Sequence, residues 1–279
     1  MGKITTIAEN KCCEGMQHVI SHESKYCSCD MTFGIYIPEK ASSSELPLIW
    51  FLSGLTCTHE NAMVKSGIQR WAAEKKIAVV FPDTSPRGEG VPDDSNFDLG
   101  QGAGFYVDSK NPPWEKNFQM WSYIQKELPE LIFSNFPLDE NKQSIMGHSM
   151  GGLGALNIAF RNPNTYKAVS AFAPISNPTA GIWGRKQFEA YLGAESELWE
   201  EYDPSILLKK RGYSGQILID QGTKDDFLEN LMPQSLEKHV NAREQGNSFR
   251  YQEGYDHSYF FVSTFIKDHV FWHEKILNK

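Results

Sequence analysis

A single serine, Ser149, stands between closely spaced glycines in the stretch "IMGHSMGGLGA", which runs from Ile145 to Ala155. Gly147, Ser149 and Gly151 form the pattern G-x-S-x-G between an apolar run expected to be a strand and a segment expected to be a helix. Small residues allow a sharp strand-to-helix turn that projects the hydroxyl above the sheet, near the free N–H groups of the helix N-terminus. The pattern favours a nucleophilic serine. The alternative is a glycine-rich turn that only packs or holds a phosphate.

A serine hydroxyl is a weak nucleophile, so this chemistry needs an acid and a base that follow the serine in the order Asp or Glu, then His. His257 in "YQEGYDHSYFF" follows an expected strand and precedes an aromatic helix, so we predict that it is the base. The alternative is a histidine that caps this helix. The acid is expected in "ILIDQGTKDDFL", where Asp220 belongs to a strand and Asp225 and Asp226 to the loop. Geometry alone leaves the choice between Asp225 and Asp226 open.

Two backbone N–H groups are expected to bind the negative charge that develops on the substrate oxygen. Met150 directly follows the serine, and Leu55 follows Gly54, where the chain leaves an expected strand. The alternative is that Gly54 only allows the chain to leave the strand, which would produce the same sequence without an oxyanion role for Leu55. His148, next to the nucleophile, is expected at the pocket rim or against a helix. Surface segments are expected to hold the histidines His18, His22, His239, His269 and His273.

Strands and helices alternate along the chain and position these residues. Apolar patterns predict strands over 31–37, 48–52, 77–81, 143–146, 168–173, 216–220 and 249–253. Helical patterns cover 62–75, 117–136, 151–161, 231–245 and 259–277. This alternation predicts an α/β fold whose mostly parallel central sheet carries helices on both faces. We expect residues 1–279 to form a single domain.

Two stretches do not fit this alternation, namely 83–114 and 177–207, and both are expected to be long loops. Long loops in compact domains are usually functional, and ligands of open α/β sheets bind beyond the carboxyl ends of the strands. We therefore expect both stretches to wall the pocket. The segment "ASSSELP" from Ala41 is expected to be a turn.

Composition narrows the classes of function. The formal net charge is -8 and no segment is rich in Lys and Arg, so nucleic-acid binding is not expected. No run approaches the roughly twenty apolar residues of a membrane span. The start, Met1 to Thr6, fits a loose acylation pattern without a second membrane signal. We expect a soluble protein of the cytoplasm, because the first residues also have no apolar core for secretion.

The five cysteines are an odd number, and the absence of a secretion signal favours reduced thiols. Cys12, Cys13, Cys27 and Cys29 do not have the spacing of a zinc site, so no metal is expected. Cys27 and Cys29 are expected to share one face of a strand, and all four to be small buried apolar residues.

Several longer stretches resemble the S-formylglutathione hydrolase, or esterase D, family. These stretches are "FLSGLTCTHEN", "FPDTSPRG", "GAGFYVD", "IMGHSMGG", "SAFAPISNP", "YLG", "ILIDQG" and "EGYDHSYFF". They cover the chain from near residue 11 to its end. The resemblance implies an α/β-hydrolase fold, a cytoplasmic homodimer, no cofactor, and cleavage of S-formylglutathione to glutathione and formate in formaldehyde detoxification.

The resemblance also assigns individual residues. Ser149 and His257 match the nucleophile and the base, and Asp225, after the glycine of "DQG", matches the acid. Leu55 and Met150 match the oxyanion donors. Among the pocket residues, Cys57 matches a family cysteine linked to sensitivity to thiol reagents. Trp183 resembles an aromatic residue that lines the acyl and glutathione pocket, although plain packing is the alternative. The "CSC" pair and His59 are not features of the family.

The expected reaction is acyl transfer through a Ser–His–Asp acyl-enzyme, with side activity on short acyl esters. Within enzymes the alternatives are a general short-chain carboxylesterase or an acyltransferase that uses an alcohol in place of water. A non-catalytic binding protein with the hydrolase fold is the alternative from another class.

Overall fold

A computed structural model describes residues 3–39, 45–243 and 246–279 of the chain. Three sequence predictions extend outside these ranges. The acylation pattern includes residues 1–2, and most of the turn from Ala41 lies in residues 40–44. The end of the expected helix 231–245 also lies outside the described residues. Within the described part of the chain, no helix is long and apolar enough to cross a membrane.

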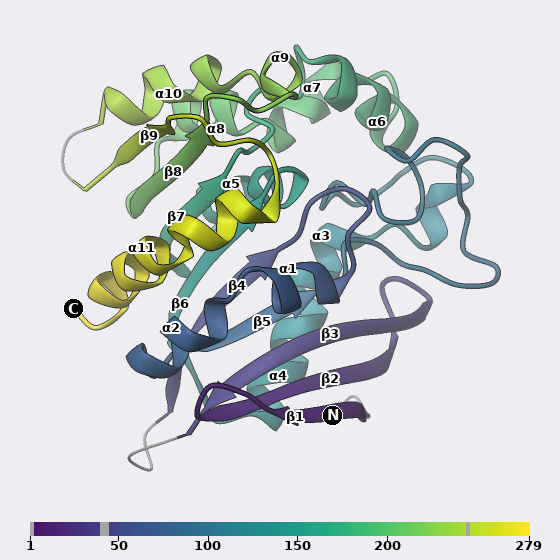
Figure 1. The fold of residues 1–279 in the computed structure, drawn as a ribbon. Coiled ribbons are helices and arrows are strands. Elements are labelled where there is room, and N and C mark those ends of the chain that lie inside the picture. The colour runs from purple at the N-terminus through teal and green to yellow at the C-terminus, as the bar shows by residue number, and fades with distance from the viewer. Residues whose placement is uncertain (1–2, 40–44, 244–245) are drawn as a thin grey trace.

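One nine-stranded sheet forms the centre of the structure, in the order β1-β2-β3-β5-β4-β6-β7-β8-β9 (Figure 1). The strands are β1 Thr5–Lys11, β2 Gly15–Ser24, β3 Cys29–Pro38, β4 Leu46–Leu52, β5 Ala78–Pro82, β6 Leu138–His148, β7 Tyr166–Phe172, β8 Gln216–Gly222 and β9 Ser248–Gln252. Strands β1, β2 and β3 pair antiparallel, and β3 pairs antiparallel with β5. From β5 to β9 every pair is parallel. The carboxyl ends of these six strands therefore meet at one edge of the sheet.

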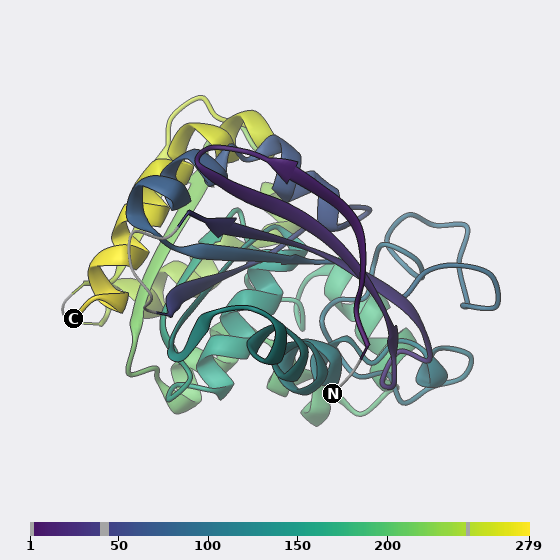
Figure 2. The ribbon, with the colours of Figure 1, turned by 90° about the horizontal axis from the view of Figure 1, so that it is seen from below.

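Helices cover both faces of the sheet, as the alternation predicts. The α-helices are α1 His59–Lys65, α2 Ile68–Lys75, α3 Met120–Ser122, α4 Leu128–Asn135, α5 Met150–Arg161, α6 Ile182–Leu192, α7 Ser196–Trp199, α8 Pro204–Arg211, α9 Leu228–Leu231, α10 Pro233–Asn241 and α11 Tyr259–Leu277. Helices α1, α2 and α11 pack together on one face, and α4 and α5 lie on the other (Figure 2). Both faces of the parallel strands are thereby shielded from water, which explains why β5 is buried along its whole length.

Three of the expected helices are interrupted. The segment 62–75 divides into α1 and α2 because Gly67 adopts a left-handed conformation with φ of 68°. In the segment 117–136, the five residues Tyr123–Glu127 form a π-helix, labelled η2, between α3 and α4. Met232, with φ of 51°, separates α9 from α10. The helix expected over 259–277 has the bounds of α11.

The prediction of a long loop over 177–207 is wrong. This segment contains α6, α7, the short 3-10 helix η3 Glu200–Tyr202 and the first half of α8. Glycine and proline at its start, in "NPTAGIW", obscure the helical pattern that begins at Ile182. The other expected loop, 83–114, does lack regular secondary structure until the 3-10 helix η1 Trp114–Lys116 begins.

Strands β1 and β2 were not expected from sequence. Six of the seven residues of β1 are exposed, so the apolar pattern that marks a buried strand is absent. The prediction that Cys27 and Cys29 share a strand face is also wrong, because β3 begins at Cys29 and Cys27 lies in the preceding turn. Cys27 is buried, whereas Cys12 and Cys29 are half-buried and Cys13 is exposed. All five cysteines are free thiols.

Three of the histidines that the sequence places at the surface are buried in the structure. His22 lies in β2, and His269 and His273 lie on the inner face of α11. Burial lowers the pKa of His22 and His269 and holds the pKa of His273 well below 6.5. The cause is that a charged imidazole loses its hydration inside the protein.

This burial predicts a loss of stability in mild acid. The folded protein keeps these imidazoles neutral, while the unfolded chain gains protons as the pH falls below about 6.5. Urea titrations should therefore give an unfolding free energy that is level above pH 7 and falls below it. The slope for each such histidine is at most about 1.4 kcal/mol per pH unit. In His273→Gln the slope should be smaller, and equal stability of the unmodified protein at pH 7.5 and 5.5 would contradict the prediction.

Candidate active site

Ser149 occupies the sharp turn between β6 and α5 at the carboxyl edge of the sheet. Its backbone has φ of 58° and ψ of -120°, a strained conformation for a residue with a side chain. Three backbone hydrogen bonds hold the turn. The Ser149 N–H donates to Phe172 O at 2.9 Å, and Ser149 O accepts from the Leu153 N–H at 3.1 Å and from the Ile175 N–H at 3.4 Å. The glycine-flanked serine therefore adopts the backbone that the sequence pattern predicts.

The flanking glycines are required because backbone atoms crowd both positions. A Cβ at Gly147 would lie 2.1 Å from Gly151 O, and a Cβ at Gly151 would lie 2.0 Å from Leu52 O. Both oxygens belong to the backbone, so they cannot move aside as the end of a flexible side chain could. The glycines thus let β4, β6 and the start of α5 approach one another closely enough to present the serine.

Gly151→Ala should destabilise the protein by about 3 kcal/mol or more, because the new methyl group must displace the β4 backbone. Gly90→Ala is the matched control. Gly90 has φ of 80°, but a Cβ added there would meet no atom within 4 Å, so this variant carries only backbone strain. That strain should cost about 1 to 3 kcal/mol. Urea unfolding of both variants would contradict the steric argument if Gly151→Ala were the more stable.

Asp225 and His257 are brought together from the loops that follow β8 and β9. His257 Nδ1 lies 2.7 Å from Asp225 Oδ2, and the Asp225 side chain is fully buried. Asp225 also accepts hydrogen bonds from Gln221 Nε2 at 2.9 Å and from the Phe227 N–H at 2.8 Å. A carboxylate can only accept, so Nδ1 of the imidazole carries the proton and Nε2 is free to act as a base.

The other two aspartates of this region point elsewhere. Asp226, the alternative left open by sequence, is exposed. Asp220 is buried in β8, where its carboxylate accepts from Arg250 Nε at 2.6 Å and from Arg250 Nη2 at 2.7 Å. Of the three aspartates, Asp225 alone contacts His257 in the described structure.

Ser149 and His257 line the same pocket, which has a volume of about 210 Å³. The structure records no hydrogen bond between the serine hydroxyl and the imidazole in the part of the chain that it describes. In ligand-free active sites such a bond is often long and tightens only when substrate binds. The His257 ring is partly exposed, at 17% of its side-chain surface, which leaves the pocket open to substrate.

The expected oxyanion donors lie beside the serine. Met150 is the first residue of α5, where an N–H has no acceptor within the helix. Leu55 follows Gly54 at the end of β4, and a Cβ at Gly54 would lie only 3.1 Å from Ser149 Cβ. Among the described residues, the Leu55 N–H has no backbone acceptor either. Both N–H groups are therefore available to a substrate oxygen at Ser149.

Two further predicted residues, His148 and Cys57, line the pocket. His148 is buried, and its ring centroid lies 4.7 Å from that of His257. Burial, assisted by His257, holds the pKa of His148 well below 6.5, so this second imidazole stays neutral. Burial also raises the pKa of the Cys57 thiol, which lowers its fraction of reactive thiolate.

A row of aromatic rings forms one wall of the pocket. Trp183 packs between Phe97 and Phe227, with ring centroids 6.5 and 5.1 Å away, and Phe227 contacts the ring of His257 at 5.0 Å. The sequence predicted Trp183 but not Phe97 or Phe227. For Phe227 a signal was present, since it stands two residues after Asp225 in the same loop.

A second Ser–His–Asp arrangement lies inside the protein. Ser170 Oγ is 2.9 Å from His269 Nδ1, and His269 Nε2 is 3.2 Å from Asp220 Oδ2. Burial opposes ionisation of Asp220, but its bonds to His269 and Arg250 outweigh burial and lower its pKa to about 2. All three side chains are fully buried, so substrate cannot reach Ser170. This arrangement joins α11 to β7 and β8.

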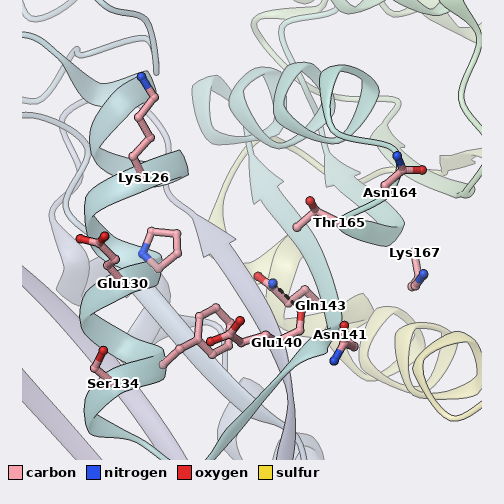
Figure 3. Close-up of a pocket in the computed structure, with 11 residues that line it drawn as sticks. Lys126, Glu130, Ser134, Glu140, Asn141, Gln143, Asn164, Thr165 and Lys167 are labelled. Atoms are coloured by element: carbon pink, nitrogen blue, oxygen red, sulfur yellow. Dashed lines mark hydrogen bonds between the residues drawn. The ribbon is translucent and has the colours of Figure 1, made fainter.

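A larger hollow of about 570 Å³ lies between α4 and the start of β6, on the other side of the sheet from α11 (Figure 3). Lys126, Glu130 and Ser134 line one side of it, and Glu140 and Asn141 line the other. Its lining contains no histidine or cysteine, so it offers no Ser–His or Cys–His pair like that of the Ser149 pocket. Elsewhere in the described residues, no group of three His, Cys, Asp or Glu side chains could hold a metal ion.

The central sheet, the serine between β6 and α5, and the Asp225–His257 pair beyond β8 and β9 define an α/β-hydrolase.

Comparisons with known proteins agree with this fold class. The Esterase family model matches residues 24–272. The chain is 55% identical over 272 residues to the S-formylglutathione hydrolase of Paracoccus denitrificans and 48% identical over 278 residues to that of Mus musculus, with 98% of each chain covered in both comparisons. A solved S-formylglutathione hydrolase from Agrobacterium tumefaciens is 45% identical and superimposes with a TM-score of 0.94 over 98% of this chain and 99% of that one. The chain therefore belongs to the S-formylglutathione hydrolase family of esterases.

Proposed function

We propose that this protein hydrolyses the thioester S-formylglutathione to glutathione and formate. The observation that carries the proposal is the 55% identity, over 98% of both chains, to a protein named for that activity. The Asp225–His257 hydrogen bond and the shared pocket of His257 and Ser149 support a serine acyl-transfer mechanism. No cofactor takes part in this mechanism.

In the first step Ser149 Oγ attacks the formyl carbonyl carbon while His257 Nε2 accepts its proton. Asp225 holds the imidazole in the tautomer that this transfer needs and stabilises the imidazolium. The N–H groups of Leu55 and Met150 donate to the carbonyl oxygen as it becomes an oxyanion. Collapse of the tetrahedral intermediate breaks the C–S bond, and the glutathione thiolate leaves with the proton held by His257.

In the second step water attacks the formyl-enzyme. His257 accepts one proton of the water and passes it to Ser149 Oγ as the C–O bond to Ser149 breaks. The product leaves as formic acid, which releases its remaining proton to solvent and becomes formate. A thiolate is a better leaving group than an amine, so the first step needs less acid assistance than amide hydrolysis does. The small pocket and its aromatic wall suit a short acyl group.

Steady-state kinetics on S-formylglutathione test this function. We expect kcat/KM for S-formylglutathione to exceed that for p-nitrophenyl acetate, and acetyl esters to react faster than long-chain esters. An apolar slot discriminates by about 1 to 3 kcal/mol per methylene, so activity on acetyl esters should be reduced but measurable. Faster cleavage of long-chain than of formyl or acetyl substrates would contradict the proposal and favour a broader carboxylesterase.

We further propose that the protein acts in formaldehyde detoxification, in the cytoplasm, as a homodimer. The close similarity to named S-formylglutathione hydrolases supports these assignments. Light scattering coupled to size-exclusion chromatography would test the dimer, since the chain mass is 31.7 kDa. A mass near that of one chain would contradict it.

A further inference from the structure

The segment Gly54–Cys57, which carries the Leu55 N–H, is a tight turn. The Cys57 N–H donates to Gly54 O at 3.3 Å, which closes the turn around Leu55 and Thr56. Thr56 has φ of 64°, in the left-handed region that β-branched residues rarely adopt. The turn therefore stores strain and must be held by its surroundings.

The first support comes from the loop that follows β5. The Thr56 N–H donates to Gly102 O at 2.9 Å, and Gly102 in turn donates to Ser85 Oγ at 2.7 Å. A Cβ at Gly102 would lie 3.0 Å from the Thr56 Cα, so the two backbones are in close contact. This contact fixes the middle of the turn.

The second support is a pair of hydrogen bonds to the carbonyl oxygen of Cys57, at the end of the turn. Cys57 O accepts from Thr84 Oγ1 at 2.5 Å and from Arg87 Nη2 at 2.7 Å. Arg87 is oriented by Asp83, whose two carboxylate oxygens lie 3.0 and 3.2 Å from Arg87 Nε. Asp83 also accepts from the Thr84 N–H at 2.6 Å, so it positions both donors at once.

Burial makes this arrangement rigid. Thr84 is fully buried and Asp83 is 6% exposed, while Arg87 keeps about a third of its side chain exposed. A guanidinium suits this site because its planar fork can bind a carboxylate through one N–H and a carbonyl through another. A lysine has no such fork.

We propose that Arg87, together with Thr84, is a positioning residue that holds the Gly54–Cys57 turn so that the Leu55 N–H stays aimed at the substrate oxygen of Ser149. This inference rests on the role proposed above for Leu55. Arg87 touches neither the reacting atoms nor Ser149 in this arrangement. It acts through the Cys57 carbonyl, and its loss should weaken binding of the transition state more than binding of the substrate.

The test uses Arg87→Met, Arg87→Lys and Thr84→Val, with Arg211→Met as the matched control. Arg211 is an exposed arginine of α8 that pairs with Glu201, far along the chain from the turn. In Arg87→Met we expect kcat on S-formylglutathione to fall on the order of 10- to 100-fold, less than the loss of a whole oxyanion donor. KM should change by less than about threefold, and Arg211→Met should behave as the unmodified protein. Arg87→Lys, which keeps the charge beside Asp83, and Thr84→Val, which removes the other donor, should each give an intermediate kcat.

A second measurement separates positioning from general weakening of the fold. An alkyl trifluoromethyl ketone adds to the serine and forms a tetrahedral oxyanion, so its inhibition constant reports oxyanion binding. Across the variants this constant should weaken in proportion to the loss of kcat/KM on p-nitrophenyl acetate. Thermal unfolding identifies any variant that does not fold, in which case the remaining variants decide the result.

The outcomes separate this inference from the proposed function. An unchanged kcat in Arg87→Met and Thr84→Val, or a rise in KM alone, would overturn the positioning role and leave the thioesterase function intact. If the unmodified protein did not cleave S-formylglutathione, the proposed function would fail, while the p-nitrophenyl acetate and ketone measurements would still test Arg87.

Discussion

Ser149→Ala should lower kcat/KM on S-formylglutathione by a factor on the order of 10⁴ to 10⁶, since the variant has no atom that can form the acyl-enzyme. The pocket and the two N–H groups remain, so the residual rate is that of water attacking a bound substrate. A fluorophosphonate probe should label the unmodified protein once per chain and leave Ser149→Ala unlabelled. Mass spectrometry of the labelled peptide locates the modified residue.

Ser170→Ala is the matched control for this result. Ser170 also has a histidine and an aspartate within hydrogen-bond range of one another, but all three are fully buried. Labelling of Ser170→Ala should match that of the unmodified protein, even though loss of the buried hydroxyl lowers its stability. Retained labelling in Ser149→Ala, or its loss in a folded Ser170→Ala, would refute the assignment of the nucleophile.

Asp225→Asn should lower kcat by a factor on the order of 10³ to 10⁴ while the fold is kept. An amide in place of the carboxylate can donate a hydrogen bond to His257 Nδ1, which favours the tautomer with its proton on Nε2 and removes the base. The charge that stabilises the imidazolium is lost as well. Rates measured from pH 6 to 9 would show this loss at every pH.

Asp226→Asn provides the comparison, because it makes the same chemical change one residue along the chain. Asp226 is exposed, whereas the Asp225 side chain is buried against His257. Asp226→Asn should therefore keep kcat within about twofold of the unmodified protein, as surface substitutions usually do. Equal losses in the two variants would show that the loop, rather than the Asp225 carboxylate, matters for catalysis.

The sequence alone predicted the serine turn well because steric constraints determine it locally. Gly147 and Gly151 are the residues that backbone crowding demands, and their spacing around Ser149 can be read directly. The parallel sheet was predicted for a similar reason, since β4, β5, β7 and β8 each contain a buried, mostly apolar run and β6 is buried from Gln143 onwards. Strand β1 was missed because its side chains face water and carry no apolar pattern.

The choice between Asp225 and Asp226 could not be made from residue types. It depends on which of the two side chains the loop directs toward His257. The Phe227 N–H and the Gln221 amide both donate to the Asp225 carboxylate and hold it in that position. The family resemblance selected Asp225, the residue that contacts His257 in the structure.

The buried histidines of α11 were missed, although a signal for them was present. His269 and His273 are four residues apart and share the spacing of Ile266 and Val270, which face the core. A helical periodicity that includes histidine is easily read as a solvated face. Their partner Ser170 lies about a hundred residues earlier in the chain, so only the folded structure shows the hydrogen bonds that they make to it.

The position of β9 has a consequence for the synthesis of this protein. Strand β9 is the last strand along the chain and lies at one edge of the sheet, and the loop that follows it places the imidazole of His257 against the Asp225 carboxylate beyond β8. A nascent chain that has completed the serine turn still has neither partner in place. Labelling of Ser149 by a fluorophosphonate probe is therefore expected only after the carboxyl-terminal segment has been synthesised and has docked. The onset of probe labelling during translation would mark the moment at which folding is complete.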